Sequence, residues 1–228
     1  MLSCEHASYK IPAAYKQVFH GQAALLRSHR GWDPGALDVA SRLQRRFNAP
    51  LLTARYSRLL VDLNRSPTHP RVFSTISRAL PVASRVELLQ TVHQPHWDAV
   101  IDAVRQAGAQ PSRRAAAPVV HLAVHSFTPT LDGVERSCEI GLLYDPRRAA
   151  EQKLALDLQR VLQAPDRRVR RNYPYRGVAD GLPTALRRRF PGRAYAGLEL
   201  ELNQRWLAQV GASAAASLLG EALRALGF

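Results

Sequence analysis

The run Val119-Val120-His121-Leu122-Ala123-Val124-His125 decides the fold class. Its β-branched and apolar residues are typical of a strand that is buried on both faces of a sheet. Similar short runs occur at residues 51–54 and 140–144, and residues 198–203 alternate apolar and polar side chains. Because segments with helical spacing separate these runs, we predict one α/β domain over residues 1–228, with a mostly parallel, mixed sheet flanked by helices.

The flanking helices are predicted from apolar residues that recur every three or four positions. We expect helices at about residues 13–27, 36–43, 83–108, 148–163 and 211–226. A further apolar run, Leu59-Leu60-Val61, resembles another strand, whereas Pro and Ser residues predict a loop at 66–82. Residues 107–118 are expected to form a linker.

Arginine dominates a strongly basic composition. Lys+Arg is 32 against 18 Asp+Glu, and the formal net charge is +14. Only Lys10, Lys16 and Lys153 are lysines, and the arginines are spread along the chain with few aromatic residues among them. Because a nucleic-acid surface needs clustered basic residues, this distribution disfavours nucleic acid as the partner. The charge is compatible with a small anionic substrate.

The composition also indicates a cellular compartment. No apolar run approaches the roughly 20 residues that a membrane-spanning helix needs, and we expect no secretory signal before the first polar turn. Two cysteines, Cys4 and Cys138, do not make a disulfide framework. We therefore expect a cytoplasmic protein with no membrane contact, and the sequence assigns no oligomeric state.

Polar residues that can carry chemistry follow several of the predicted strands. They are Glu5, His6, Asp62, Asn64, Arg65, His125, Ser126, Glu199 and Glu201. In open α/β sheets the ligand crevice lies at the carboxyl ends of the strands, where such groups from distant parts of the chain meet. Two histidines with nearby carboxylates, and without thiolates, are a ligand set that suits zinc.

The candidate ligands also have plain structural explanations. His6 taken alone is typical of an exposed turn, and Asp33 precedes Pro34 in a turn where aspartate is common for local reasons. His121 lies in the middle of a strand among apolar residues, so we predict a hydrogen-bonded core histidine there. His125 lies at the strand end and is the better ligand candidate.

Glu199 and Glu201 lie on one face of the last predicted strand, because side chains alternate along a strand. Two carboxylates on one face are compatible with a solvated edge. They are equally compatible with a catalytic base and its neighbour, and their spacing does not choose between the two interpretations.

Seven short motifs together resemble the N-formylglutamate amidohydrolase family. They are, in order, Ser3–Ser8, Asp33–Ala36, Ser57–Arg65, His125–Pro129, Ile140–Tyr144, Asn172–Gly177 and Leu198–Gln204. Each motif is modest alone, but the ordered set covers residues 3 to 206. The resemblance implies the α/β fold of zinc exopeptidases and phosphorylase/hydrolase-like proteins, a zinc site and amide-bond cleavage. That family includes the last step of one route of histidine degradation, in which N-formylglutamate becomes formate and glutamate.

The resemblance also implies a set of metal ligands. His6 and His125 match the family's two motif histidines and are implied ligands of one zinc ion per chain. Asp33 matches a motif aspartate and is the implied third ligand, with Glu5 as its rival. Only two residues precede the first motif, where family members usually have a full strand. Either the start codon is placed late or that strand is clipped, and a clipped strand would loosen His6 and weaken the metal site.

The remaining motif residues have implied catalytic and binding roles. Glu201 matches the glutamate of the last motif and resembles the general base of carboxypeptidases, with Glu199 beside it. The implied groups for the substrate and its oxyanion are Arg136, Arg58, Asn64, Arg65, Asn172, Tyr175 and Ser126. Guanidinium groups suit a bidentate grip on the carboxylates of an acyl-glutamate.

The implied activity is that of a zinc-dependent amidohydrolase. It would cleave the amide of an N-formyl or N-acyl amino acid, such as N-formylglutamate, with a metal-activated water. Two alternatives remain: a metal-dependent hydrolase of another small amide or peptide, and a basic, non-enzymatic nucleic-acid-binding protein. The last alternative predicts an affinity that falls steeply with salt and no bound zinc.

Overall fold

A six-stranded sheet organises the chain. In this computed structural model, which describes residues 1–109 and 117–228, the strand order is β2-β1-β3-β8-β6-β7. The strands are β1 Leu2–Cys4, β2 Leu51–Thr53, β3 Val119–Phe127, β6 Ile140–Leu143, β7 Val169–Arg171 and β8 Tyr195–Asn203. All neighbouring pairs are parallel except β6 and β8. The prediction of a mostly parallel, mixed sheet in an α/β fold is confirmed.

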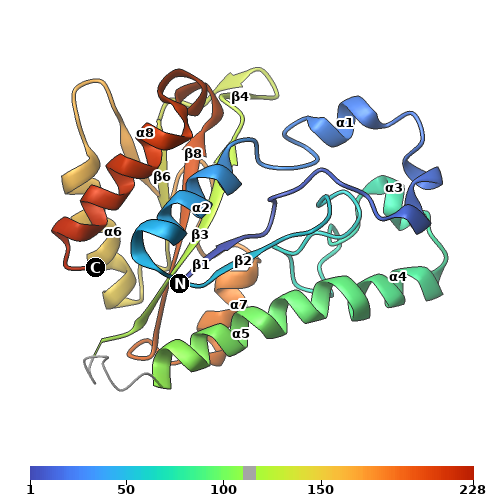
Figure 1. The fold of residues 1–228 in the computed structure, drawn as a ribbon, viewed down its shortest axis with the longest axis horizontal. Coiled ribbons are helices and arrows are strands. Elements are labelled where there is room, and N and C mark those ends of the chain that lie inside the picture. The colour runs from blue at the N-terminus through green and yellow to red at the C-terminus, as the bar shows by residue number, and fades with distance from the viewer. Residues whose placement is uncertain (110–116) are drawn as a thin grey trace.

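Helices cover both faces of this sheet (Figure 1). The helices α2 Ala36–Phe47, α6 Ala149–Leu162 and α8 Gln204–Ala225 pack on one face, where they bury residues such as Leu43, Leu158 and Leu219. The helices α5 Gln94–Ala109 and α7 Leu182–Arg189 pack on the other, where Val104 and Leu186 join a second apolar cluster. Burial on both faces explains why β3 and β8 are rich in apolar residues.

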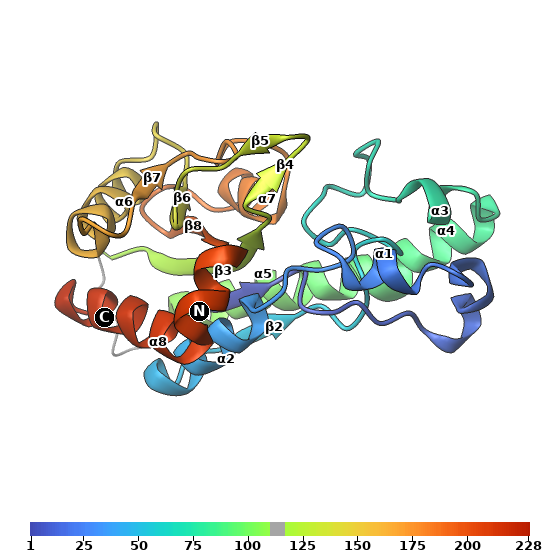
Figure 2. The ribbon, with the colours of Figure 1, turned by 90° about the horizontal axis from the view of Figure 1, so that it is seen from above.

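The remaining segments lie beside the sheet, away from α6 and α8 (Figure 2). They contain two short 3-10 turns, Ala13–Tyr15 and Gln17–Phe19, and the helices α1 Ala23–Arg27, α3 Thr75–Arg78 and α4 Val82–Leu88. A π-helical turn, Leu89–His93, joins α4 to α5. A small hairpin of β4 Thr130–Leu131 and β5 Val134–Glu135 follows β3. Among the described residues, no helix is long and apolar enough to cross a membrane.

Two predicted elements are wrong. Residues 13–27 form no single helix, because Gly21 has a φ of 74° and breaks the helical path between the 3-10 turns and α1. The run Leu59–Val61 forms no strand, although it is buried. The Leu60 N–H bonds back to Ser57 O, and Leu59 O accepts from the Ser77 hydroxyl, so this segment is a turn fixed by local and side-chain contacts.

Other boundaries shift. The expected helix at 83–108 is α4, the π turn and α5 in succession. The last helix begins at Gln204 rather than about residue 211, because the Asn203 side chain caps it by accepting from the Arg205 N–H. Gly211, with a φ of 79°, interrupts that helix. The expected linker at 107–118 lies mostly at residues 110–116, outside the described residues.

Candidate active site

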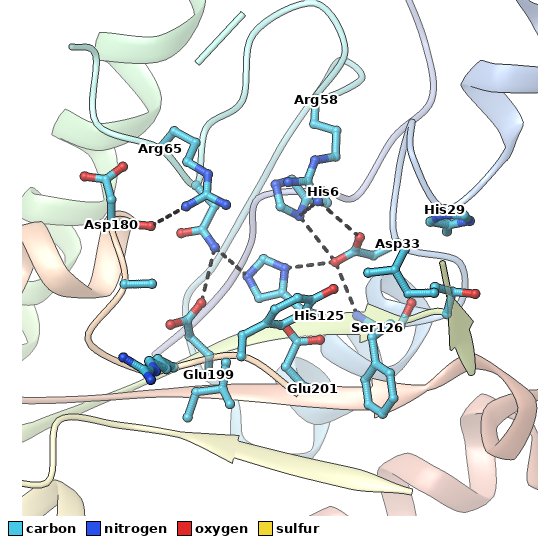
Figure 3. A pocket seen from close by; sticks show the side chains of 18 residues that line it. His6, His29, Asp33, Arg58, Arg65, His125, Ser126, Asp180, Glu199 and Glu201 are labelled. Carbon is cyan, nitrogen blue, oxygen red and sulfur yellow. Dashed lines mark hydrogen bonds and ion pairs between the residues drawn. The ribbon is translucent and has the colours of Figure 1, made fainter. Parts of the chain in front are cut away.

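Several distant segments converge on one cavity of about 190 Å³ near the carboxyl ends of β1 and β3. They include the end of β1, the turn before α2, the loop after β2, the end of β3, the loop between β7 and α7, and the middle of β8. The lining includes His6, His29, Asp33, Arg58, Asn64, Arg65, His125, Ser126, Tyr175, Arg176, Asp180, Glu199 and Glu201. The crevice that sheet topology predicts therefore exists, and Figure 3 shows its polar lining.

Two histidines and one aspartate meet at the centre of the site. Asp33 Oδ2 lies 2.9 Å from His125 Nδ1 and 3.3 Å from His6 Nδ1 (Figure 3). One ligand atom from each of the three side chains lies within 4.8 Å of the others, and all three residues are buried. Two imidazole nitrogens and a carboxylate oxygen at this spacing are a donor set that suits a divalent metal such as zinc.

The outer nitrogen of each imidazole faces a second carboxylate. His6 Nε2 lies 2.7 Å from Asp62 Oδ1, and His125 Nε2 lies 3.1 Å from Glu5 Oε2. Metal-binding histidines usually donate their other ring N–H to such a group, which fixes the tautomer. The geometry places Asp33 between the two Nδ1 atoms and Glu5 behind His125, so Asp33 is the better third ligand of the two rivals.

Backbone contacts hold Asp33 in place. Its N–H donates to His6 O, and its Oδ2 accepts the Ser126 N–H at 3.2 Å. The Ser126 hydroxyl donates to Pro34 O at 2.8 Å. Gly35 then starts α2 with a φ of 80°, a conformation that glycine adopts without strain. The turn is thereby attached to both β1 and β3.

Opposite charges compensate the burial of these groups. Burial alone would raise the pKa of Asp33, but His6 and His125 outweigh it and hold this pKa well below its ordinary value. Burial would likewise raise the pKa of Glu5, which His125 lowers. Burial would lower the pKa of His125, but Asp33 and Glu5 raise it well above the ordinary value. The carboxylates thus stay ionised and favour a cation between them.

The same balance applies to the second histidine. Burial would raise the pKa of Asp62, but Arg58 and His6 hold it below the ordinary range. Arg58 Nη2 donates to Asp62 Oδ2 at 2.7 Å, and Arg58 Nη1 lies 3.1 Å from His6 Nδ1. His6 is buried between these partners, and the short strand β1 before it pairs with both β2 and β3, so the short N-terminal strand does not loosen His6.

Glu199 and Glu201 enter the cavity from β8. They pair in register with Ala123 and His125 of β3, so both lie on the predicted common face. Asn64 Nδ2 donates to Glu199 Oε2 at 3.2 Å. Glu201 is buried, and its Oε2 has no hydrogen-bond partner among the described residues. Burial raises the pKa of Glu201 to about 8, although His125 opposes the shift.

A glycine makes room for Glu201. Gly141 of β6 is its register partner, and a Cβ on Gly141 would lie 2.1 Å from Tyr173 O and 3.1 Å from Glu201 Cβ. Any larger residue would displace the strand or the Tyr173 loop. The antiparallel strand therefore supports the position of Glu201 without contributing a side chain.

Five of the predicted substrate residues line the cavity. Arg65 Nη1 donates to Asp180 O at 2.8 Å, and Asn64 Oδ1 accepts the Leu182 N–H. Arg58 lies against the two histidine-bound carboxylates, as described above. Ser126 and Tyr175 are also in the lining. These residues meet as the motifs predict.

Arg136 and Asn172 do not line this cavity. Arg136 Nη1 donates to the Tyr175 hydroxyl at 2.9 Å, with its guanidinium 4.9 Å from the centre of that ring. Asn172 Oδ1 accepts the N–H groups of Tyr144 and Gly177 and shapes their loop. Both residues therefore support Tyr175 or its loop from behind.

Sequence reasoning missed several residues of the site. Asp62 was seen only as a polar residue after an apolar run, and its contact with His6 depends on a loop that has no regular pattern. Arg176, His29 and Asp180 also line the cavity. The motif Asn172–Gly177 contains Arg176 and was the available signal for it. His121 is confirmed as a core histidine that contacts the Ser3 and Tyr195 hydroxyls.

Two histidines, an aspartate and a buried glutamate around one small cavity of an α/β sheet are an arrangement that suits a hydrolytic enzyme. The family model of N-formylglutamate amidohydrolase matches residues 1–208. The chain therefore belongs to the N-formylglutamate amidohydrolase family, and it is a hydrolase. This membership argues against the non-enzymatic, nucleic-acid-binding alternative.

Two solved structures are similar to the whole chain. Gene product Atu2144 from Agrobacterium tumefaciens has a TM-score of 0.79 and 30% sequence identity, covering 100% of this chain and 91% of that one. N-formylglutamate amidohydrolase from Ralstonia eutropha JMP134 has a TM-score of 0.70 and 18% identity, covering 98% and 93%. At that identity the second likeness shows the fold alone. No curated protein sequence matches the chain.

Proposed function

We propose that the protein is a zinc-dependent amidohydrolase that cleaves the amide of a small N-formyl or N-acyl amino acid. The observation that carries the proposal is the position of Asp33 Oδ2 between His6 Nδ1 and His125 Nδ1. The outer nitrogens of both imidazoles face the carboxylates of Asp62 and Glu5, an arrangement that turns both Nδ1 atoms toward Asp33.

The two imidazoles and the carboxylate fit zinc better than they fit a cation that binds oxygen ligands alone. Two imidazoles and one carboxylate, with no thiolate, are a common three-ligand set for catalytic zinc. When bound there, zinc supplies Lewis acidity, which lowers the pKa of water toward ~7 and polarises the scissile carbonyl. We propose His6, Asp33 and His125 as its ligands, with one ion per chain.

Glu201 is the proposed general base. Its Oε2 is buried and free of hydrogen bonds among the described residues, and its raised pKa of about 8 marks a carboxylate that accepts a proton readily. It would take the proton of the attacking water and pass it to the leaving nitrogen. Glu199 is held by Asn64 and is the proposed neighbour that orients this side of the cavity.

Arginine side chains define the substrate class. Arg58, Arg65 and Arg176 line a cavity of about 190 Å³, which matches a small molecule rather than a folded protein. A guanidinium group binds a carboxylate through two parallel hydrogen bonds. We therefore propose an acyl amino acid that carries at least one free carboxylate, with N-formylglutamate as the first candidate. Arg58 lies near the metal ligands and is proposed to stabilise the developing oxyanion.

The test is a substrate panel with controlled metal content. Purified protein is stripped with chelator, reloaded with zinc, and assayed with N-formylglutamate, N-acetylglutamate, N-formylglutamine and N-formylmethionine. We expect hydrolysis only after zinc is restored, about one zinc per chain by elemental analysis, and a preference for the acidic substrates. His125→Ala should lose the metal, with His20→Ala as an exposed control.

Two results would overturn the proposal. Full zinc occupancy in both His6→Ala and His125→Ala would show that the metal binds elsewhere. Equal hydrolysis in the stripped and the reloaded protein would show that the reaction needs no metal. A preference for N-formylmethionine over N-formylglutamate would keep the chemistry and reject the acidic substrate.

A further inference from the structure

A carboxylate outside the cavity lining faces His125 Nε2, an atom that also lies 3.5 Å from Asn64 Nδ2. Glu5 is completely buried, and it follows β1 directly. Its Oε2 lies 3.1 Å from His125 Nε2, and its Oε1 lies 3.7 Å from His96 Nε2. Neither contact has the alignment of a formed hydrogen bond. Among the described residues, these two histidines are the ion-pair partners of Glu5.

A buried charge in this state needs compensation. An unpaired carboxylate in a low-dielectric interior costs several kcal/mol unless charges and hydrogen bonds offset the cost. The two imidazoles supply that offset through their contacts with Glu5 at 3.1 Å and 3.7 Å. An apolar or amide side chain would fill the same space without this cost. The retention of a charge here therefore points to a role for it.

The position of His96 in the first turn of α5 supports such a role. The π turn Leu89–His93 shifts the helix by one residue just before α5, and such turns often occur near functional sites. His93 Nε2 lies 2.8 Å from Arg65 O, and the Trp97 ring lies 4.9 Å from the His93 ring. The start of α5 is thus attached to the loop that lines the cavity, and His96 reaches Glu5 from this anchored turn.

The other metal-ligand histidine makes a useful comparison. Asp62 contacts His6 Nε2 at 2.7 Å and is itself held by Arg58. Glu5 and His96 are arranged in the same way. The carboxylate of Glu5 faces the outer nitrogen of His125, and the His96 ring contacts the other oxygen of that carboxylate. The distances are longer on the His125 side, 3.1 Å and 3.7 Å.

We infer that Glu5 and His96 are positioning residues for His125. The charge of Glu5, 3.1 Å from His125 Nε2, favours the tautomer that carries its proton on Nε2 and turns the Nδ1 lone pair toward Asp33 and the metal position. His96 holds the carboxylate of Glu5 in that orientation from α5. Neither residue touches the substrate or the metal. The inference rests on the proposed zinc site and adds the residues that set its affinity.

The experiment measures zinc affinity directly, with a chromophoric chelator as competitor and the full-length chain. Glu5→Gln keeps the size of the side chain and removes the charge, so folding should survive. We expect the zinc Kd to rise about 10–100-fold in Glu5→Gln, the usual effect of losing an outer partner of a metal ligand. His96→Gln should raise it by a smaller factor, and His20→Gln, at an exposed position, should leave it unchanged.

A merely structural role would give a different pattern. Thermal unfolding in chelator reports the fold alone, and it should change little in Glu5→Gln. Cobalt-substituted protein provides a spectroscopic signature, because its visible absorption depends on the geometry of the ligands. We expect that absorption to shift in Glu5→Gln and His96→Gln.

A zinc Kd within twofold of wild type in folded Glu5→Gln would overturn the inference while leaving the zinc hydrolase intact. A lower thermal midpoint in chelator with an unchanged Kd would also overturn it, since Glu5 would then only stabilise the fold. If Glu5→Gln does not fold, an unchanged Kd in His96→Gln decides against the pair. A wild-type protein that binds no zinc would overturn both this inference and the proposed function.

Discussion

Strand β8 and the loop between Ala54 and Ser66 both line the cavity, but their backbones are held in different ways. β8 pairs with β3 on one side and with β6 on the other, so its backbone groups bond to neighbouring strands. The loop is equally buried at Leu60 and Val61, yet it forms neither helix nor strand. Its N–H groups bond to scattered backbone and nearby side-chain acceptors, and three of its carbonyl groups contact side chains that lie far away in the chain.

Those distant side chains are specific. Leu59 O accepts the Ser77 hydroxyl, Leu63 O accepts the Trp97 Nε1–H, and Arg65 O lies 2.8 Å from His93 Nε2. Buried backbone polar groups must find partners, and outside regular structure only side chains or water supply them. Glu201, the proposed base, is therefore held by the hydrogen-bonded ladder of the sheet. The proposed substrate-binding residues Arg58 and Arg65 depend instead on a few single contacts of their loop.

The largest expected effect is on β8. Glu201→Gln keeps the size of the side chain but cannot take a proton, so turnover should fall by roughly 10²–10⁴ while zinc stays bound. The matched control is Glu199→Gln, two residues along the same ladder, which should alter substrate affinity more than turnover. The measurement is steady-state kinetics with elemental analysis. Near-normal turnover in Glu201→Gln would remove it as the base, and a larger loss in Glu199→Gln would move the role there.

The second effect belongs to the loop. Arg65→Lys removes the planar fork that binds a carboxylate, so KM for an acidic substrate should rise about 10–100-fold, with a smaller change in kcat. Arg105→Lys, at an exposed ion pair on α5, is the control. Kinetics on N-formylglutamate give the answer. An unchanged KM would show that Arg65 serves only to hold Asp180.

The third effect is a pH dependence of the metal-free protein. Glu201 has a raised pKa of about 8 when folded, against an ordinary value of 4.5. Between these pH values the folded state holds a proton that the unfolded state has lost, so stability falls as pH rises through this window. Glu201→Gln should flatten that fall and raise the thermal midpoint at pH 8 by roughly 2–4 °C for each kcal/mol recovered. Thermal scans in chelator from pH 5 to 8.5 test this, and parallel curves for wild type and variant would contradict it.

The smallest effect tests the single contacts of the loop. Trp97→Phe keeps an aromatic ring and removes the donor to Leu63 O. We expect a loss of about 1 kcal/mol in the free energy of unfolding and a modest rise in KM through the neighbouring Asn64. Denaturant unfolding with kinetics checks both. If Trp97→Phe matches wild type in both measurements, the loop is held more firmly than its contacts indicate.

The fold was predictable where periodicity carries the information. The apolar runs of β3 and β8 and the helical spacing of α2 and α6 are local patterns, and each element forms where its pattern lies. The run Leu59–Val61 misled because a buried apolar stretch resembles a strand whatever its backbone does. Its turn depends on Ser77 and Trp97, and nothing in its own sequence records those partners.

The site was predictable to the extent that short motifs carry its residues. His6, Asp33, His125, Glu199 and Glu201 meet in one cavity, although no spacing rule places them together. The partner of each histidine could not be predicted, because it depends on which atom of an imidazole faces which carboxylate. Arg136 marks another limit, because it lies outside the seven motifs and does not line the cavity, and its guanidinium donates to the Tyr175 hydroxyl.

The order of the strands has a consequence for synthesis of the chain. β1 pairs with β3 across Leu2 and Leu122, and β8 takes its place between β3 and β6 although it is made last. A ribosome that adds 5–20 residues per second therefore makes His6 roughly 10–40 s before Glu201 exists. The three proposed zinc ligands all precede β8, so the growing chain contains the complete ligand set before it contains the proposed base. Zinc that binds the folded state alone would stabilise that state, so the supply of metal would also set how much of this chain stays folded.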